Sequence, residues 1–582
     1  MGLARKLWAA RPRLRAAGPG FASGLVYSVL SLLTLPPVSA WWLSPVVVAP
    51  LAWCATRPGR ARDAALGVWF GAVPLWVVQQ WWVQNVSRFG FFPLVAIQAL
   101  WPAVFVGLFA ALHRSTLRAP VTLAGAAVWT AVEVLRADYF LAGYAWGLLA
   151  HPTIDWEPIA MAASLGGVFA VSFLLAGLGC SVALAAHEPK KGVAHTAAWV
   201  AAMLLAIGAS AWAAPGQRGA PLGPIAIAAV QTNLPQDNKI AWRPEDQRRD
   251  FSRFIALTRE AAAAGPDVIV WPETMMPGIS LEPSAMRALD ERQISYFLDE
   301  RTPDGERVSL PATAFGHALL EEQRTHAIPM LVGDEAIEGL RVVEEGGGVG
   351  IDFDRRYNSV YRIEGGAVQP PRYDKIELTP FGETMPLVSR WEWLERRLLA
   401  FAAGGMVFDL SAGHRRTVFD IPTKAGATVR VVTPICFEVT EPSLCRRLVF
   451  DGVARRAGVL INPTNDGWFG RWEMGRVQHM QISRWRCVEL GTPMVRAANT
   501  GISCSIDARG RVLGVARDAG GGTSRTDGVL SATVEPGAGA TVYARGGFVL
   551  GHAVFAAACV LLAVAWVRRP NATPRTGGVA RP

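Results

Sequence analysis

The chain has 582 residues, a formal net charge of +10 and a hydrophobic content of 51%, with a mean hydropathy of +0.25. These values exclude an ordinary soluble protein, while 18% charged residues exclude an entirely buried one. They indicate a membrane part joined to a water-soluble part. The Lys and Arg residues fall mostly in short segments between apolar runs, so the predicted partner is a lipid bilayer and not nucleic acid.

Eight apolar runs approach the roughly 20 residues that a helix needs to cross a bilayer. The first and fifth are short. The first run could instead be a signal peptide, because Val38-Ser39-Ala40 resembles a cleavage site, but an uncleaved span is favoured. The runs cover residues 21–35, 38–56, 64–83, 91–112, 121–135, 159–186, 195–214 and 547–567.

Basic residues occur on every second loop between these runs, which predicts that both termini lie in the cytoplasm. The predicted organisation is a membrane domain with seven transmembrane helices (1–214), a domain outside the membrane (215–545), a closing helix (546–567) and a disordered cytoplasmic tail (568–582). The basic clusters are Arg5, Lys6, Arg11, Arg13 and Arg15; Arg57, Arg60 and Arg62; Arg114 and Arg118; Lys190 and Lys191; and Arg568 and Arg569.

The segment 215–545 alternates short β-like apolar runs with charged helical pieces, which predicts an α/β domain. Helices are expected at 245–264 and 472–490. The insert 281–311 and the Gly-rich piece 346–350 are expected to be a flexible arm and a surface loop. Strands are expected at 225–231, 268–271, 329–333, 358–363, 429–435, 458–461 and 494–498.

The seven cysteines predict neither a disulfide framework nor a metal site. Cys54, Cys180 and Cys559 fall inside apolar runs where no pairing partner is expected. No Cys-x-x-Cys pair has the spacing of a structural zinc site. We therefore expect no metal and no cofactor.

Three polar residues follow strand-like runs or lie in a Pro/Gly turn, where an open α/β sheet presents its functional groups. Glu273 emerges from the run 268–271 and is either a general base or a cap of the next segment. Cys436 is either a nucleophile or an inert small core residue. Lys375 would stabilise a thiolate and an oxyanion, with Glu383 orienting it. The residues alone do not show that these groups meet.

In this order and with these neighbours, the residues resemble the nitrilase (carbon-nitrogen hydrolase) superfamily, whose hallmark is a Glu-Lys-Cys triad. The finer resemblance is to the apolipoprotein N-acyltransferase family, which has seven leading spans, an outer nitrilase-like domain and one closing span. The strings that carry it are Trp271-Pro272-Glu273, Tyr357-Asn358-Ser359, Pro380-Phe381-Gly382-Glu383, Cys436-Phe437-Glu438, residues 465–470 and residues 496–501.

The resemblance implies an αββα sandwich for the outer domain and assigns roles to its residues. It makes Glu273 the general base, Lys375 the oxyanion stabiliser and Cys436 the nucleophile. The sequence departs from the family pattern at Phe437, where Tyr is frequent, and at Gly467, where Ala is usual. The supporting groups are Glu383, Glu438, Asn358 and the backbone N–H of Phe437.

The implied reaction takes a fatty acyl group from a membrane phospholipid, through a cysteine thioester, to the N-terminal amine of diacylglyceryl-cysteine in apolipoproteins. The implied location is the bacterial inner membrane, with the catalytic domain on the periplasmic side and a monomeric enzyme. A mobile apolar cover should keep water off the thioester. Trp391, Trp393 and Leu394 are candidates for it, or else they are ordinary packing or interfacial aromatics.

Two other functions fit parts of the pattern. A membrane-tethered amidase or nitrilase that hydrolyses a C–N bond would use the same triad, but it would not need eight spans. A transporter or scaffold would carry ionisable residues at the centre of its spans. These spans hold few charges, Glu133 being one near a boundary.

Overall fold

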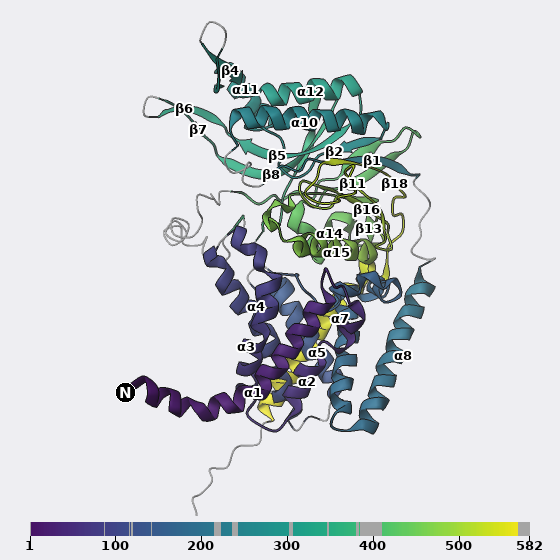
Figure 1. Cartoon of the computed structure of the whole chain (residues 1–582). Coiled ribbons are helices and arrows are strands. Elements are labelled where there is room, and N and C mark those ends of the chain that lie inside the picture. Colours follow the sequence, from purple (N-terminus) through teal and green to yellow (C-terminus); the bar gives the residue numbers. More distant parts are fainter. Residues whose placement is uncertain are drawn as a thin grey trace, which may run out of the picture.

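The computed structural model describes residues 2–86, 88–115, 117, 120–140, 143–214, 223–235, 242–301, 306–345, 348–379, 383–384 and 410–568. An elongated bundle of helices carries an α/β domain on one end, and the C-terminal helix returns into the bundle (Figure 1). The predicted cover residues Trp391, Trp393 and Leu394, and the predicted tail beyond Arg568, lie outside the described residues.

The described part of the helical domain contains helices that match most of the predicted spans. Six stretches are long and apolar enough to cross a membrane: 17–34, 61–79, 90–113, 163–185, 189–213 and 543–567. The second predicted span is a 3-10 helix followed by the short α2, and the fifth is the 14-residue α5. The helices are α1 (Gly2–Thr34), α2 (Ala49–Thr56), α3 (Ala61–Gln79), α4 (Arg88–His113), α5 (Val121–Val134), α7 (Ala163–Ala185), α8 (Pro189–Ala213) and α16 (Val549–Val567).

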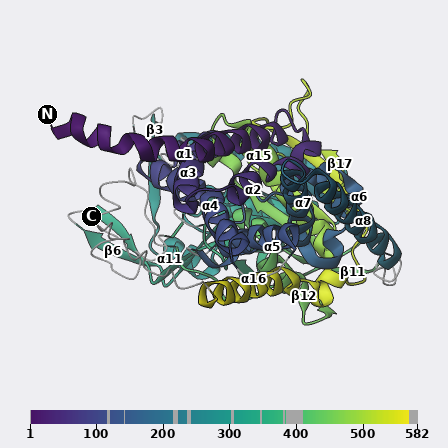
Figure 2. The same cartoon turned by 90° about the horizontal axis from the view of Figure 1, so that it is seen from below.

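Helices α1 and α3 run parallel and touch through glycines. A Cβ atom added at Gly67 would lie 2.2 Å from the carbonyl oxygen of Ala17, and one at Gly71 would lie 2.4 Å from that of Phe21. The two backbones therefore approach so closely that only glycine fits at these two positions. Such close contacts through small residues are typical of membrane helix pairs. Figure 2 shows α16 on the side of the bundle opposite α1.

The α/β domain has two six-stranded sheets, ordered β18-β1-β2-β5-β8-β9 and β10-β11-β14-β15-β16-β17. Helices α10 (Pro244–Ala263) and α12 (Ala314–His326) lie over the first sheet, and α14 (Pro442–Val449) and α15 (Glu473–Leu490) lie between the second sheet and the bundle (Figure 1). The layers are thus α, β, β and α, as expected. The first sheet comprises β18 (Gly528–Val534), β1 (Ile225–Gln231), β2 (Val268–Val270), β5 (Met330–Glu338), β8 (Arg355–Glu364) and β9 (Ala367–Asp374); the second comprises β10 (Phe419–Pro422), β11 (Thr428–Val432), β14 (Val459–Thr464), β15 (Met494–Ala498), β16 (Cys504–Ile506) and β17 (Val512–Val515).

Alternating side chains of β1 build the two cores that hold these layers together. Ile225, Ile227 and Ala229 belong to the core shared with the second sheet. Ala228 and Val230 belong to the core beneath α10 and α12. Successive residues of a strand point to opposite faces, so the apolar run 225–230 of β1 packs on both sides of the sheet.

The described residues of the insert 281–311 form regular secondary structure, and a flexible arm stays a prediction. These residues form α11 (Pro283–Glu291) and an antiparallel pair of β3 (Ser295–Arg301) and β4 (Arg307–Pro311). Helix α11 begins with a proline, which suits a first helical turn, and buries Ala285 and Leu289. Residues 348–350 of the Gly-rich piece lie in β7 (Gly348–Asp352), which pairs with β6 (Arg341–Glu345) in a second antiparallel pair.

The two domains dock through buried and charged contacts. The indole N–H of Trp146 donates to Gln478 Oε1 at 2.9 Å, and the backbone N–H of Val168 donates to Glu489 Oε1 at 2.8 Å. Around these contacts, Asp155 pairs with Arg484, and Glu157 pairs with Arg509 and Arg511. These hydrogen bonds and ion pairs therefore fix the α/β domain to one end of the helical bundle.

Candidate functional site

The three predicted catalytic residues lie just beyond the ends of three strands, β2 and β9 of the first sheet and β11 of the second. Glu273 lies three residues beyond β2, Lys375 directly follows β9, and Cys436 begins the 3-10 helix η8 (Cys436–Thr440) beyond β11. The backbone N–H of Lys375 donates to the carbonyl of Asn358 in β8 at 2.8 Å. Glu273, Lys375 and Cys436 are all buried.

Lys375 lies between two carboxylates. Its Nζ is 2.8 Å from Glu383 Oε1 and 3.4 Å from Glu273 Oε1. Asn358 Nδ2 bridges the same two carboxylates, donating to Glu273 Oε1 at 2.7 Å and to Glu383 Oε1 at 3.1 Å. The structure therefore brings four of the predicted site residues into one hydrogen-bonded cluster.

The second oxygen of Glu273 is also held. The backbone N–H of Asn465 donates to Glu273 Oε2 at 2.8 Å. Both carboxylate oxygens are thus fixed by donors, which sets the direction in which Glu273 can accept a further proton.

Electrostatics keep the lysine charged. Burial by itself would lower the pKa of Lys375, but the carboxylates of Glu383 and Glu273 outweigh it, and the pKa is raised. Burial would raise the pKa of Glu383, and the Lys375 ammonium reverses this and lowers it. The resting cluster therefore contains a lysine ammonium ion facing an ionised Glu383.

The thiol of Cys436 has the opposite tendency. Burial, and next the charge of Glu273, raise the pKa of Cys436, and Lys375 only partly offsets them. The resting thiol is therefore neutral near pH 7. Cys436 also has a φ of 50°, a left-handed conformation that a non-glycine residue adopts only when its surroundings impose it.

Glu438 joins the loop of the cysteine to the loop of the lysine. Its Oε2 accepts from the backbone N–H of Ile435 at 2.7 Å and the hydroxyl of Tyr373 at 2.8 Å. Its Oε1 accepts from the backbone N–H groups of Ile376 at 2.7 Å and Glu377 at 3.0 Å. One buried carboxyl group thus sets the distance between the two loops.

A second buried network supports the site and was not predicted from the sequence. Asp466 accepts from His479 Nδ1 at 2.9 Å and from Arg496 at 3.3 Å, and its pKa is lowered to about 2 because His479 and Arg496 outweigh burial. Arg496 also donates to Asn462 Oδ1 at 2.7 Å, and Asn462 Nδ2 contacts the carbonyl of Cys436 at 3.4 Å. In the sequence, only the strings 465–470 and 496–501 pointed to these residues, and they did not predict which side chains contact one another.

The turn that carries Cys436 faces the helical domain. The ring of Phe437 stacks on Tyr144 with centroids 6.1 Å apart, and Phe469 contacts Trp82 and Trp146 at 4.9 and 5.8 Å. Aromatic side chains from both domains therefore pack together beside the turn that carries Cys436.

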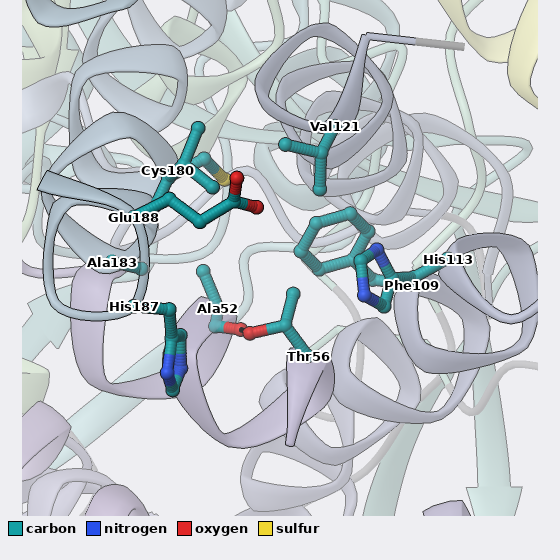
Figure 3. Close-up of a pocket in the computed structure, with 10 residues that line it drawn as sticks. Ala52, Thr56, Phe109, His113, Val121, Cys180, Ala183, His187 and Glu188 are labelled. Atoms are coloured by element: carbon teal, nitrogen blue, oxygen red, sulfur yellow. Dashed lines mark hydrogen bonds between the residues drawn. The ribbon is translucent and has the colours of Figure 1, made fainter. Parts of the chain in front are cut away.

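A separate cavity of about 180 Å³ lies at the other end of the bundle. In Figure 3, the carboxylate of Glu188 points into it, near Cys180, Phe109 and His113. His113 is the last residue of α4, and the first residues of this helix lie beside the catalytic domain. Because an α-helix rises about 1.5 Å per residue, the length of α4 separates the cavity from Cys436. Glu188 is exposed and paired with Lys191, and none of the predicted catalytic residues lines the cavity.

Family models match both parts of the chain. Residues 226–541 match carbon-nitrogen hydrolase, and residues 7–181 match the apolipoprotein N-acyltransferase N-terminal domain. The chain belongs to the apolipoprotein N-acyltransferase family of carbon-nitrogen hydrolases.

Members of this family match the chain over most of its length. An apolipoprotein N-acyltransferase of Geobacter metallireducens is 29% identical over 94% of this chain and 96% of its own. The one from Vibrio cholerae is 28% identical over 88% of this chain and 91% of its own. Among solved structures, an amidase from Nesterenkonia sp. aligns with 55% of this chain and 92% of its own, at 14% identity and a TM-score of 0.31. Family membership therefore rests on sequence.

Proposed function

We propose that this protein transfers a fatty acyl group from a membrane phospholipid to the N-terminal amine of diacylglyceryl-cysteine in apolipoproteins. The observation that carries the proposal is the buried cluster of Glu273, Lys375 and Glu383 next to Cys436, on the side of the α/β domain that faces the bundle. Lipid substrates keep their chains in the bilayer, so a site at this boundary needs to receive only their reacting groups.

In the first step, Sγ of Cys436 attacks the ester carbonyl of the phospholipid while Glu273 takes the thiol proton. The negative charge on the tetrahedral intermediate is stabilised by the Lys375 ammonium and the backbone N–H of Phe437. The C–O bond of the ester then breaks, Glu273 returns the proton to the departing alkoxide, and a lysophospholipid leaves. Cys436 is left as a thioester.

In the second step, the amine of diacylglyceryl-cysteine attacks the thioester carbonyl and loses a proton to Glu273. The C–S bond breaks, the amide forms, and Glu273 returns the proton to the sulfur. A neutral resting thiol agrees with this scheme, because the base then removes the proton only as the nucleophile attacks. Glu438, Asn358 and Glu383 hold these groups in place.

We also infer the membrane topology from the direction of the helices. One end of the bundle is remote from the catalytic domain. Helices α2, α4 and α7 finish there, and α3 and α8 start there. Arg57 and Arg114 directly follow α2 and α4, and Lys190 lies in the first turn of α8, so all three are at this remote end. Basic residues favour the cytoplasmic side. This supports seven leading spans, a closing span, cytoplasmic termini and a periplasmic catalytic domain in a bacterial inner membrane. A cover formed by Trp391, Trp393 and Leu394 remains part of the proposal.

The test supplies purified protein in nanodiscs with phospholipid and a diacylglyceryl-cysteine peptide. We expect N-acyl peptide and lysophospholipid in equal amounts from the wild type and neither from Cys436→Ala. Small amides are offered in parallel. Release of ammonia from them, without acylation of the peptide, would instead support the amidase alternative.

A further inference from the structure

A short turn of the catalytic domain lies beside the first residues of α16. It joins β12 (Phe450–Asp451) to β13 (Ala454–Arg455). Arg446 of α14 donates from Nη2 to the carbonyl of Gly452 at 2.9 Å and from Nε to the carbonyl of Ala544 at 3.0 Å. Its guanidinium carbon lies 3.9 Å from the ring centroid of Phe548. A single side chain thus links the turn to the start of the helix.

The position of Phe548 sets the height of the turn. Phe548 immediately precedes α16, which has 19 residues and so rises about 28 Å. The hydrocarbon core of a bilayer is about 30 Å thick. If α16 crosses the bilayer, as the proposed topology requires, Phe548 lies at the membrane boundary and the turn lies at the level of the lipid headgroups.

The turn has the composition of a membrane-contacting surface. Val453, at its tip, is 65% exposed. Arginines surround it, and three acidic groups lie among the described neighbours. Asp420 is opposite Arg430 in the pairing of β10 with β11, Asp451 lies 4.0 Å from Arg416, and Glu377 is paired with Arg447. An exposed apolar tip with a cationic rim is the pattern of interfacial anchors. The arginines are Arg416, Arg430, Arg446, Arg447 and Arg456.

The positive charges are crowded. Burial, and then the charges of Arg416 and Arg430, lower the pKa of Arg456. A structural role explains part of this arrangement, because Arg416 and Arg456 donate to the carbonyl of Arg447 at the end of α14. A carbonyl is a neutral acceptor, however, so these bonds do not neutralise the arginines, whose five charges outnumber the carboxylates of Asp420, Asp451 and Glu377. The bonds also do not account for an exposed valine at the tip.

We propose that residues 451–454 and the five arginines, here called the basic turn, insert into the headgroup layer beneath the catalytic domain and bind the phosphate groups of anionic phospholipids. Helix α14 follows η8, which begins with Cys436. Anchoring the basic turn would therefore hold the reactive cysteine at a constant height above the bilayer, a role that goes beyond acyl transfer itself.

The test measures amide hydrogen exchange of the peptide 450–456 in the full-length protein. The protein is placed in nanodiscs of phosphatidylcholine, in nanodiscs that also contain phosphatidylglycerol, and in detergent. Each arginine near an anionic surface favours binding by about fivefold. We expect exchange to be slowed at least about fivefold more with phosphatidylglycerol than with phosphatidylcholine alone.

Matched variants separate the basic turn from general effects of charge and polarity. Val453→Asp and Arg416→Glu should abolish the added protection. Phe297→Asp, at a side chain that is 63% exposed on β3, and Arg292→Glu, exposed just after α11, make the same changes at the end of the domain remote from the membrane. These two should leave the protection of peptide 450–456 unchanged.

Three results would overturn the proposal. Equal exchange in both nanodiscs and in detergent would place the turn in water. Equal protection in both nanodiscs would show apolar insertion without recognition of anionic lipid. Protection of the detergent-solubilised protein by inorganic phosphate alone would show a site for a soluble anion.

Discussion

At the scale of single residues, the proposed site combines a neutral cysteine thiol, Cys436, with a charged lysine, Lys375. Burial raises the pKa of Cys436, and the negative charge of Glu273 raises it further. Glu273 therefore has two opposite effects: its charge disfavours the free thiolate, and its position allows it to take the proton during attack. These two effects can be separated by experiment.

Replacing Glu273 by Gln should reduce acyl transfer about 100- to 10,000-fold, because the proposed general base is lost. The same change should lower the pKa of Cys436, because one negative charge near the sulfur disappears. Iodoacetamide alkylation of Cys436, followed by peptide mass spectrometry across pH, should therefore rise at lower pH in Glu273→Gln than in wild type. An unchanged or higher alkylation midpoint would contradict the assigned electrostatics.

Glu438 provides a prediction about pH and stability. Burial, opposed by donors such as the backbone N–H of Glu377, raises the pKa of Glu438 to about 7 from the ordinary 4.5. A raised pKa means that the folded state holds the proton more tightly, so the stabilisation is complete below about pH 4.5 and is lost as pH rises through about 7. The difference corresponds to about 3 kcal/mol of unfolding free energy.

Glutamine resembles the protonated form of Glu438. Thermal unfolding in detergent should show the wild type losing stability relative to Glu438→Gln between pH 5 and pH 8. Other buried carboxyl groups titrate in both proteins, so the difference between the two curves is the informative quantity. Parallel curves would show that Glu438 does not titrate in this range.

The sequence identified the chemical groups of the site but not the contacts that arrange them. Glu273, Lys375 and Cys436 could be singled out because each follows a strand-like run or lies in a turn. The hydrogen bonds that the backbone N–H groups of Ile376 and Asn465 donate to Glu438 and Glu273 join residues separated by 62 and 192 positions. Such pairs depend on how the sheets pack, which local sequence does not encode.

At the scale of elements, local pattern predicted strands well where both faces are buried. The expected strands 225–231 and 494–498 match β1 and β15, because continuous apolar runs are distinctive. Strand β9 was missed, since Pro370 and Pro371 argue against a strand. It is the edge strand of its sheet, where prolines are tolerated. Strand β18 pairs with β1 from about 300 positions away, a partnership that no local pattern predicts.

The glycine contact between α1 and α3 gives a prediction at this scale. Gly71→Leu would place a side chain where even a Cβ lies 2.4 Å from the Phe21 carbonyl. We expect the melting temperature in detergent to fall by roughly 2 to 10 °C, from about 1–3 kcal/mol of overpacking. Gly208→Leu, in α8, is the control, because a Cβ added at Gly208 would meet nothing within 4 Å. Equal shifts in the two variants would show that the close approach of α1 and α3 is not important for stability.

At the scale of the whole molecule, the catalytic domain is held over one end of the bundle by two kinds of contact. Trp146 is 1% exposed and reaches Gln478 across the boundary. The pairs of Glu157 with Arg509 and Arg511 are partly exposed, and such pairs contribute about 0–1 kcal/mol. The buried aromatic contact should therefore dominate the docking of the two domains.

Trp146→Ala should cost about 3–5 kcal/mol and increase hydrogen exchange in residues 465–470, which pack against Trp146 through Phe469. Acyl transfer should fall with it, because these residues include Asn465, whose N–H holds Glu273. Glu157→Gln should leave both quantities within about 1 kcal/mol of wild type. Similar effects of the two substitutions would mean that the charged contacts dominate docking.

The central claim is that acyl transfer passes through a thioester on Cys436, and intact-mass spectrometry tests it most directly. Purified wild-type protein incubated with phospholipid and no acceptor should gain the mass of one acyl chain, which hydroxylamine removes and which a diacylglyceryl-cysteine peptide takes up. Cys436→Ala should gain nothing. Failure of the wild type to form the adduct, or acyl transfer by Cys436→Ala at the wild-type rate, would contradict the thioester mechanism.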